Sequence, residues 1–187
     1  MESNLQKSID DLHSVILNYN DENAEYDKKS LLKLALDETI NAKDSTGYPP
    51  LHSAVFQCNL EVVSILLNVT GIDINARNDD GRTALDLAAA LGHNGALNAL
   101  IKGDADVNAK GTGGLTPLHW AAQEGNIGTL NALINAHADK EAKDNSGKTP
   151  LHYAALQGHK GFFHKRHTAI TKELIARGAA IDAKDLK

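Results

Sequence analysis

The hydrophobic and polar positions of this chain repeat with a period of 33 to 34 residues. The pattern Gly-x-Thr-Pro-Leu-His at residues 114–119 returns at 147–152, and degenerate copies stand at 47–52 and 81–86. The motif positions 50, 84, 117 and 150 are spaced by 34, 33 and 33 residues. A unit of this length buries too little apolar surface by itself, so we expect each copy to stack on its neighbours.

Each repeat predicts two helices. Thr116 is suited to cap a helix N-terminus, and the proline after it is suited to the first helical position. Leu118, Ala121 and Ala122 then fall three and four residues apart, which is the spacing of a buried helix face. Gly125 is expected to end this helix in the left-handed conformation. A second apolar run follows in every unit and predicts a second, antiparallel helix.

The block Thr-Pro-Leu-His-x-Ala-Ala, followed by Gly-His or Gly-Asn and later by a segment like Asp-Val-Asn-Ala, resembles the ankyrin repeat. The resemblance implies an all-α solenoid of stacked antiparallel helix pairs, joined by short β-hairpin or loop fingers. We expect a helical, degenerate capping repeat over 1–42, with an exposed polar loop over 18–29. One continuous array of four repeats should follow it, at 43–76, 77–109, 110–142 and 143–187.

Two repeats depart from the pattern. Cys58 stands where a helix-ending glycine is expected, and a non-glycine residue in the left-handed conformation costs about 1 kcal/mol. The first repeat should therefore be less regular. In the second repeat Asp86 replaces the motif histidine. The resemblance implies that this histidine bridges the cap threonine and neighbouring backbone, so Asp86 puts that hydrogen bond in question.

The last repeat carries eight extra residues, most simply 161–168, before its second helix. Phe163, His167, Ile170 and Leu174 keep a helical spacing, so a second helix that starts about two turns early is favoured over a floppy loop. The insertion holds a basic cluster and two of the three phenylalanines of the chain. It is either a contact element for an acidic or apolar partner surface or an expansion tolerated at a permissive turn.

The formal net charge of −5 is unevenly spread. Residues 1–43 and 44–110 each carry −4, whereas residues 111–187 carry +3. The acidic first part argues against nucleic acid as the general partner. A single cysteine suits a reducing compartment, and no apolar run approaches the length of a membrane span. We expect a soluble, monomeric, intracellular protein, most simply cytoplasmic, with secretion into a host cell left open.

The histidines do not predict chemistry. Those of the motif occupy a position that the resemblance implies is structural. His159, His164 and His167 have a spacing that could place two imidazoles on one helix face, but no cysteine or carboxylate is spaced with them. The chain has no nucleophile with its base, no phosphate-binding loop and no paired-carboxylate site. We therefore expect no enzymatic activity, no cofactor and no metal.

The resemblance implies a non-enzymatic protein-interaction module that binds a partner protein through its concave face and fingertips. In the family the contacts come from residues around the motif glycine and from the end of each first helix. Mapped copy by copy, with the two aromatic residues beside the motif histidine added, the expected contact residues are Tyr48, Phe56, Gln57, Asp79, Asp80, Arg82, Leu91, Thr112, Leu115, Trp120, Gln123, Glu124, Asn145, Lys148, Tyr153, Leu156 and Gln157.

Several points stay open at this stage. Trp120 and Tyr153, expected to be adjacent in space, could instead pack between neighbouring first helices. The array either ends with a modest cap near 187 or is a fragment of a longer protein. The alternative function is a regulatory or inhibitory segment of a larger multidomain protein. The near-identical repeats are also similar to ankyrin proteins of intracellular bacteria, some of which act as effectors inside host cells.

Overall fold

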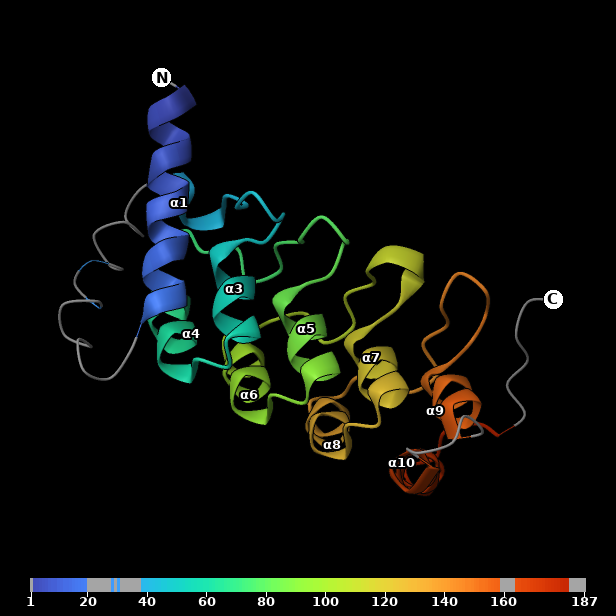
Figure 1. Ribbon diagram of the computed structural model, residues 1–187. Helices are drawn as coiled ribbons and strands as arrows, with labels where there is room; N and C mark the ends of the chain where they lie inside the picture. The colour runs from blue at the N-terminus through green and yellow to red at the C-terminus, as the bar shows by residue number, and fades with distance from the viewer. Residues whose placement is uncertain (1, 20–27, 29, 31–37, 159–163, 182–187) are drawn as a thin grey trace.

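The computed structural model contains two rows of helices (Figure 1). It describes residues 2–19, 28, 30, 38–158 and 164–181. The first helices of the repeats are α3 (Pro50–Phe56), α5 (Ala84–Leu91), α7 (Pro117–Glu124) and α9 (Pro150–Gly158). The second helices are α4 (Leu60–Leu67), α6 (Asn94–Lys102), α8 (Ile127–Asn135) and α10 (His164–Ala176).

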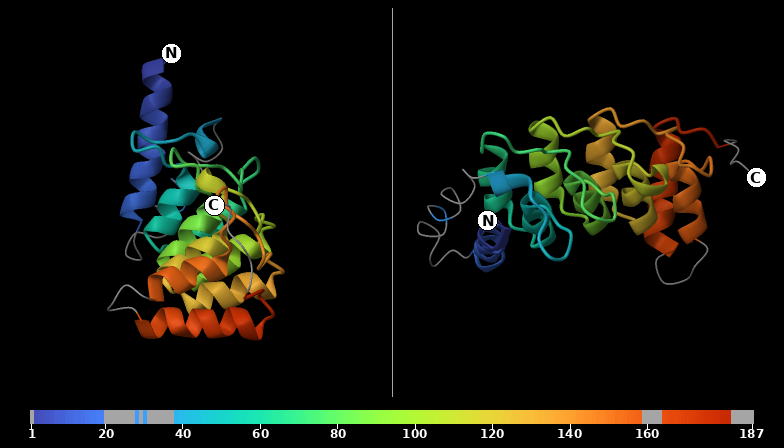
Figure 2. Two further views of the ribbon diagram at one scale, coloured as in Figure 1. Left: turned by 90° about the vertical axis from the view of Figure 1, so that its right-hand side faces the viewer. Right: turned by 90° about the horizontal axis from the view of Figure 1, so that it is seen from above.

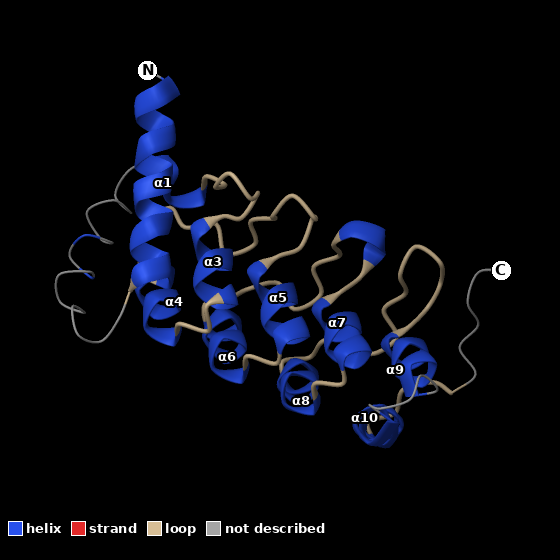
Figure 3. Ribbon diagram, viewed as in Figure 1, coloured by secondary structure: helices blue, strands red, loops and turns tan. Residues whose placement is uncertain are grey.

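Each row packs helix against successive helix, and α1 (Glu2–Asn18) packs against α3. As a result α1 and α10 lie at opposite ends of the array (Figure 2). The fingers between repeats are loops, with short 3-10 helices at η1 (Glu38–Asn41) and η2 (Thr112–Gly114) (Figure 3). The one β-bridge in the described ranges joins Arg77 and Thr83, so the solenoid is all-α and its fingers are loops rather than hairpins.

The expected capping residues explain where the first helices begin and end. The Thr83 hydroxyl accepts the Asp86 N–H at 3.1 Å, and Pro117 stands at the first position of α7. Gly92 and Gly125 close α5 and α7 in the left-handed conformation, with φ of 75° and 74°. Cys58 takes the same place after α3 and is left-handed too, with φ of 56°.

Leucines and small alanines form one continuous core between the two rows. Leu85, Leu97, Leu118 and Leu130 are among its fully buried members, and the same cluster extends from α1 to α10. Alanines at the first-helix contacts, such as Ala88, allow neighbouring helices to approach closely. No repeat therefore has a core of its own.

A ladder of asparagine side chains also joins the repeats, and the sequence pattern did not reveal it. Asn41, Asn75 and Asn108 each accept the backbone N–H of an aspartate 31 or 32 residues further on, at 2.8 to 2.9 Å. At the end of the third repeat Glu141 instead accepts the N–H of Ala180, in the fourth repeat, at 2.8 Å. Each repeat thus fixes the backbone that follows the next second helix.

Of the helical extension of about two turns expected from the insertion, one turn lies within the described structure. The thirteen residues of α10 compare with nine in α8. His167 Nε2 donates to the Gln123 carbonyl at 2.9 Å, as Asn126 Nδ2 donates to the equivalent Ala90 carbonyl at 2.7 Å. His167 therefore holds the register of Asn126, and the inserted residues precede it. Residues 159–163, the loop expected over 20–27, the apolar run 31–36 and residues 182–187 lie outside the described residues.

Candidate functional site

The fingers are held in shape by acidic or amide side chains at their base. Asp44 Oδ1 accepts the backbone N–H groups of Thr46 and Tyr48 at 2.9 and 3.0 Å. Asp144 makes the same bonds to Ser146 and Lys148, both at 2.8 Å. These are the turn bonds that aspartate forms with the residues after it. They fix the direction in which each fingertip points.

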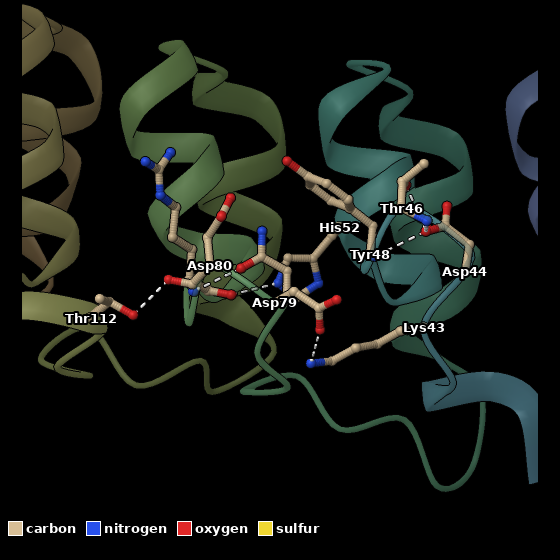
Figure 4. Close-up of polar contacts among 10 residues, drawn as sticks. Lys43, Asp44, Thr46, Tyr48, His52, Asp79, Asp80 and Thr112 are labelled. Carbon is tan, nitrogen blue, oxygen red and sulfur yellow. Dashed lines mark hydrogen bonds and ion pairs between the residues drawn. The ribbon is translucent and has the colours of Figure 1, made fainter.

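Neighbouring fingertips are also bonded to one another (Figure 4). Lys43 Nζ lies 2.7 Å from Asp79 Oδ1, and the Thr112 hydroxyl donates to the Asp80 carbonyl at 2.6 Å. Further along, the Asn145 N–H donates to the Gly113 carbonyl at 2.9 Å. The fingertips therefore form one connected edge rather than independent loops.

The motif histidine links a first helix to the next finger. His52 Nε2 donates to the Arg82 carbonyl at 2.8 Å, and His119 Nε2 donates to the Lys148 carbonyl at 3.0 Å. Burial lowers the pKa of His52 to about 4, against the opposing effect of the Arg82 carbonyl, and burial also lowers the pKa of His119. Neutral imidazoles are therefore part of the folded structure.

All the expected contact residues except Trp120 and Tyr153 occupy three places. The exposed fingertips carry Asp79, Asp80, Thr112 and Asn145. The half-buried segments that lead from the fingertips into the first helices carry Tyr48, Arg82, Leu115 and Lys148. The ends of the first helices carry Phe56, Gln57, Leu91, Glu124 and Leu156, which are exposed, and Gln123 and Gln157, which are half-buried.

The structure brings some of these residues together and separates others. The rings of Tyr48 and Phe56 are 6.4 Å apart, and Tyr48 also packs against the core. The apolar row along the helix ends is not continuous, because the polar Gln123 and Glu124 stand between Leu91 and Leu156. Among the apolar residues of this row, Phe56 is the most exposed.

Trp120 and Tyr153 both contact neighbouring repeats or their own finger. The Arg82 guanidinium lies 4.0 Å from the centre of the Trp120 ring. Tyr153 packs edge-on against His119, with ring centres 5.5 Å apart, and its hydroxyl donates to Asp144 at 2.7 Å. Burial and this bond raise the Tyr153 pKa to about 12. Both residues take part in packing between repeats, and a contact role for them stays a prediction.

A groove between α1 and α3 contains three of the expected contact residues. Its volume is about 250 Å³, and Tyr48, Phe56 and Gln57 line it together with Leu17 and Asp44. Leu17 and Phe56 are 50% and 57% exposed. Sequence reasoning missed Leu17. It lies one position beyond Ile16, the last residue of the buried stripe of α1. An apolar side chain at that position faces the edge of the stripe.

Comparison with known proteins agrees with this geometry. A family model for ankyrin repeats, built on three copies, matches residues 22–111 and 95–185. The chain belongs to the ankyrin-repeat family. Ankyrin repeats are protein-interaction modules, and the match indicates no catalytic family.

Three relatives carry segments similar to this chain within much larger proteins. Over 77 residues the chain is 43% identical to the Neurogenic locus Notch protein of Drosophila melanogaster. The matched segment covers 41% of this chain and 3% of that protein. A probable serine/threonine-protein kinase of Dictyostelium discoideum is 44% identical over 46 residues, 25% of this chain and 5% of the kinase. Cortactin-binding protein 2 of Ornithorhynchus anatinus is 42% identical over 55 residues, which are 29% of this chain and 3% of that protein. The chain spans a small fraction of each relative's length.

Within the described part of the chain, histidine, cysteine, aspartate and glutamate side chains form no group of three that could hold a metal ion. His159 lies outside that part. Of the helices that are described, none combines the length and the apolar character needed to cross a membrane.

Proposed function

We propose that this ankyrin-repeat chain is a non-enzymatic module that binds a partner protein through its concave face and fingertips. We further propose that it works inside the cell as a monomer, with a capping repeat over 1–42 and four repeats over 43–187. The observation that carries the proposal is the groove between α1 and α3, which lies where the fingertip residue Tyr48 meets the helix-end residues Phe56 and Gln57.

The groove has the features of a site for an apolar anchor. Half of the Leu17 side chain and more than half of the Phe56 ring are exposed at its edges. Exposed apolar groups that flank a cavity are typical of binding hot spots, because burying them on association removes apolar surface from water. Asp44 at the same edge supports a partner segment in which a basic or amide group accompanies the apolar residue.

Phe56→Asp tests this proposal. The change places a charge in the apolar groove, and Phe56 is exposed enough that the fold should tolerate it. In affinity capture from cell lysate, we expect proteins retained by the wild type to be lost with Phe56→Asp. Leu115→Ala should weaken the same capture if the fingertips also contribute, with little change in the melting temperature.

Ile181→Asp is the matched control, because Ile181 is 74% exposed and lies beyond α10, far along the chain from the groove. The control should retain the partner. If both aspartate variants capture the same proteins as the wild type at unchanged melting temperature, recognition through the α1–α3 groove is refuted.

A second candidate is a regulatory or inhibitory role as the ankyrin segment of a larger protein. Leu156, Ile175 and Ile181 leave exposed apolar surface on the last repeat, which favours a further covering element there. A captured enzyme whose activity falls when the chain is added would support this role. The relatives named above are animal and amoebal proteins, so they give no support to a host-directed bacterial effector.

A further inference from the structure

A second groove lies where the inserted turn of α10 crosses the preceding repeats. It has a volume of about 380 Å³ and is bounded by the turns that end α5 and α7, by the start of α8 and by the first turn of α10. None of the predicted contact residues of the concave face and fingertips lines it. The groove is therefore distinct from the concave-face site.

The insertion creates this groove. His167 stands in the register of Asn126, so the residues just before it, Lys165 and Arg166, have no counterpart in the second and third repeats. Those repeats begin their second helices at Asn94 and Ile127, directly after the turn. The extra turn of α10 instead projects over the turn of the third repeat and forms a wall there.

Glycines line the floor of the groove, where they have no side chain to fill it. A Cβ atom on Gly125 would lie 3.2 Å from the His167 ring and 3.3 Å from the Arg166 Cβ. A Cβ atom on Gly92 would lie 3.1 Å from the Asn126 side chain. Both glycines also hold a positive φ that favours glycine. The contact between α10 and the third repeat is therefore close.

The lining of the groove is basic and partly apolar. Lys165 and Arg166 are exposed at its rim, and the described residues of the lining include no carboxylate. Arg166 Nη2 donates to Asn126 Oδ1 at 2.9 Å, which holds the guanidinium beside the groove. Ile127, 40% exposed, and Ala169 supply apolar surface next to these two cations.

From this combination we propose that the groove binds an acidic segment of a partner protein, with an apolar side chain next to a glutamate or aspartate. Paired basic side chains complement carboxylates, and the volume accommodates one or two side chains rather than a folded surface. A protein segment fits better than nucleic acid, because residues 1–110 of the chain carry a net −8, from the −4 of residues 1–43 and the −4 of residues 44–110.

The test uses a fluorescein-labelled peptide of alternating glutamate and leucine, titrated with the full chain and followed by fluorescence anisotropy. A peptide with glutamine in place of glutamate reports the contribution of charge. We expect the acidic peptide to bind, the glutamine peptide to bind at least about tenfold more weakly, and Lys165→Glu to weaken the acidic peptide by a similar factor.

Lys172→Glu is the matched control, because Lys172 is an exposed lysine of the same helix outside the groove. It should leave the dissociation constant within about twofold of the wild type. Ala169→Phe fills the groove without a change of charge and should also abolish binding. Phe56→Asp should bind the peptide normally, which separates this site from the concave-face proposal.

Three outcomes would overturn the inference. The acidic peptide could fail to bind the wild type, or Lys172→Glu could weaken it as much as Lys165→Glu, which would indicate a diffuse electrostatic effect. A single-stranded oligonucleotide of equal charge could displace the peptide as well as unlabelled peptide does, which would indicate nucleic acid. Circular dichroism melts of each variant establish that the fold is intact.

Discussion

One polar position in each repeat links the helix cap to the next finger. The residues at this position differ in how many of their polar side-chain atoms form hydrogen bonds. His119 uses both ring nitrogens: Nδ1 accepts the Thr116 N–H at 3.1 Å, and Nε2 reaches the next finger. His52 reaches the next finger, but its Nδ1 is buried without a partner, since Pro49 replaces the cap threonine. Asp86 does the reverse. Its Oδ2 accepts the N–H and the hydroxyl of Thr83 at 2.8 and 2.9 Å, while Oδ1 is buried without a partner.

The Asp86 carboxylate therefore destabilises the fold at neutral pH. Burial raises its pKa to about 6, although the bonds from Thr83 and the charges of Arg77 and Arg82 oppose the shift. A folded-state pKa above the unfolded value means that the stabilising contribution is present below pH 3.8 and is lost as pH rises through 6. The cost at pH 7 is about 3 kcal/mol.

Asp86→Asn should remove that cost, because the amide is neutral and its oxygen can accept the same two bonds. We expect the variant to be more stable than the wild type at pH 7 by about 1 to 3 kcal/mol, with the advantage smaller by about 2 kcal/mol at pH 4.5. Urea unfolding followed by circular dichroism measures both. Asp80→Asn is the exposed control. An advantage that is equal at the two pH values would show that the charge of Asp86 is not the cause.

Among the helices, the sequence predicted the elements whose cause is local. Proline at the first position of α7, glycine at its end and the three-and-four spacing between them give that helix without tertiary information. The asparagine ladder could not be predicted, because Asn75 bonds a backbone N–H 31 residues away whose position only the stacking defines. Leu17 of α1 was missed as a groove residue because only the packing of α1 on α3 brings it beside Phe56. The described part of α10 begins at His164, and the residues that would hold the rest of the expected extension lie outside the described residues.

Cys58 follows the end of α3 in a left-handed backbone conformation, which favours glycine. Its φ of 56° is left-handed and its side chain is exposed, so a β-carbon adds strain there without a packing gain. Cys58→Gly should raise the free energy of unfolding by about 0.5 to 1 kcal/mol, after the greater flexibility of glycine in the unfolded chain is allowed for. Thermal melts should move up by about 1 to 4 °C. Cys58→Ala, which keeps the β-carbon, should not gain; an equal gain in both variants would implicate the thiol.

Across the whole molecule, buried titratable groups act in opposite directions on the stability of the continuous core. His13, His52 and His119 are buried from α1 to α7, and burial lowers the pKa of each. In the unfolded chain these histidines take up protons near pH 6.5, whereas folded His52 does so only near 4. The contribution of His52 is thus complete above pH 6.5 and is lost as pH falls toward 4, whereas that of Asp86 grows over much of the same range. The contributions of His13 and His119 are lost in the same direction, as pH falls below 6.5.

Between pH 7 and 4.5, protonation of His52 in the unfolded chain should lower the free energy of unfolding by about 2 kcal/mol, and protonation of Asp86 in the folded chain should raise it by about 2 kcal/mol. The effects of His52 and Asp86 should therefore nearly cancel, whereas His13 and His119 should still lower the stability of the wild type on acidification. His52→Gln should flatten the pH dependence, Asp86→Asn should steepen it, and the double variant should restore the wild-type slope. Urea unfolding midpoints of all four proteins, measured across this pH range, give the four slopes to compare. A double variant that follows either single variant would mean that the two side chains, one on α3 and one on α5, titrate as a coupled pair across the repeat boundary.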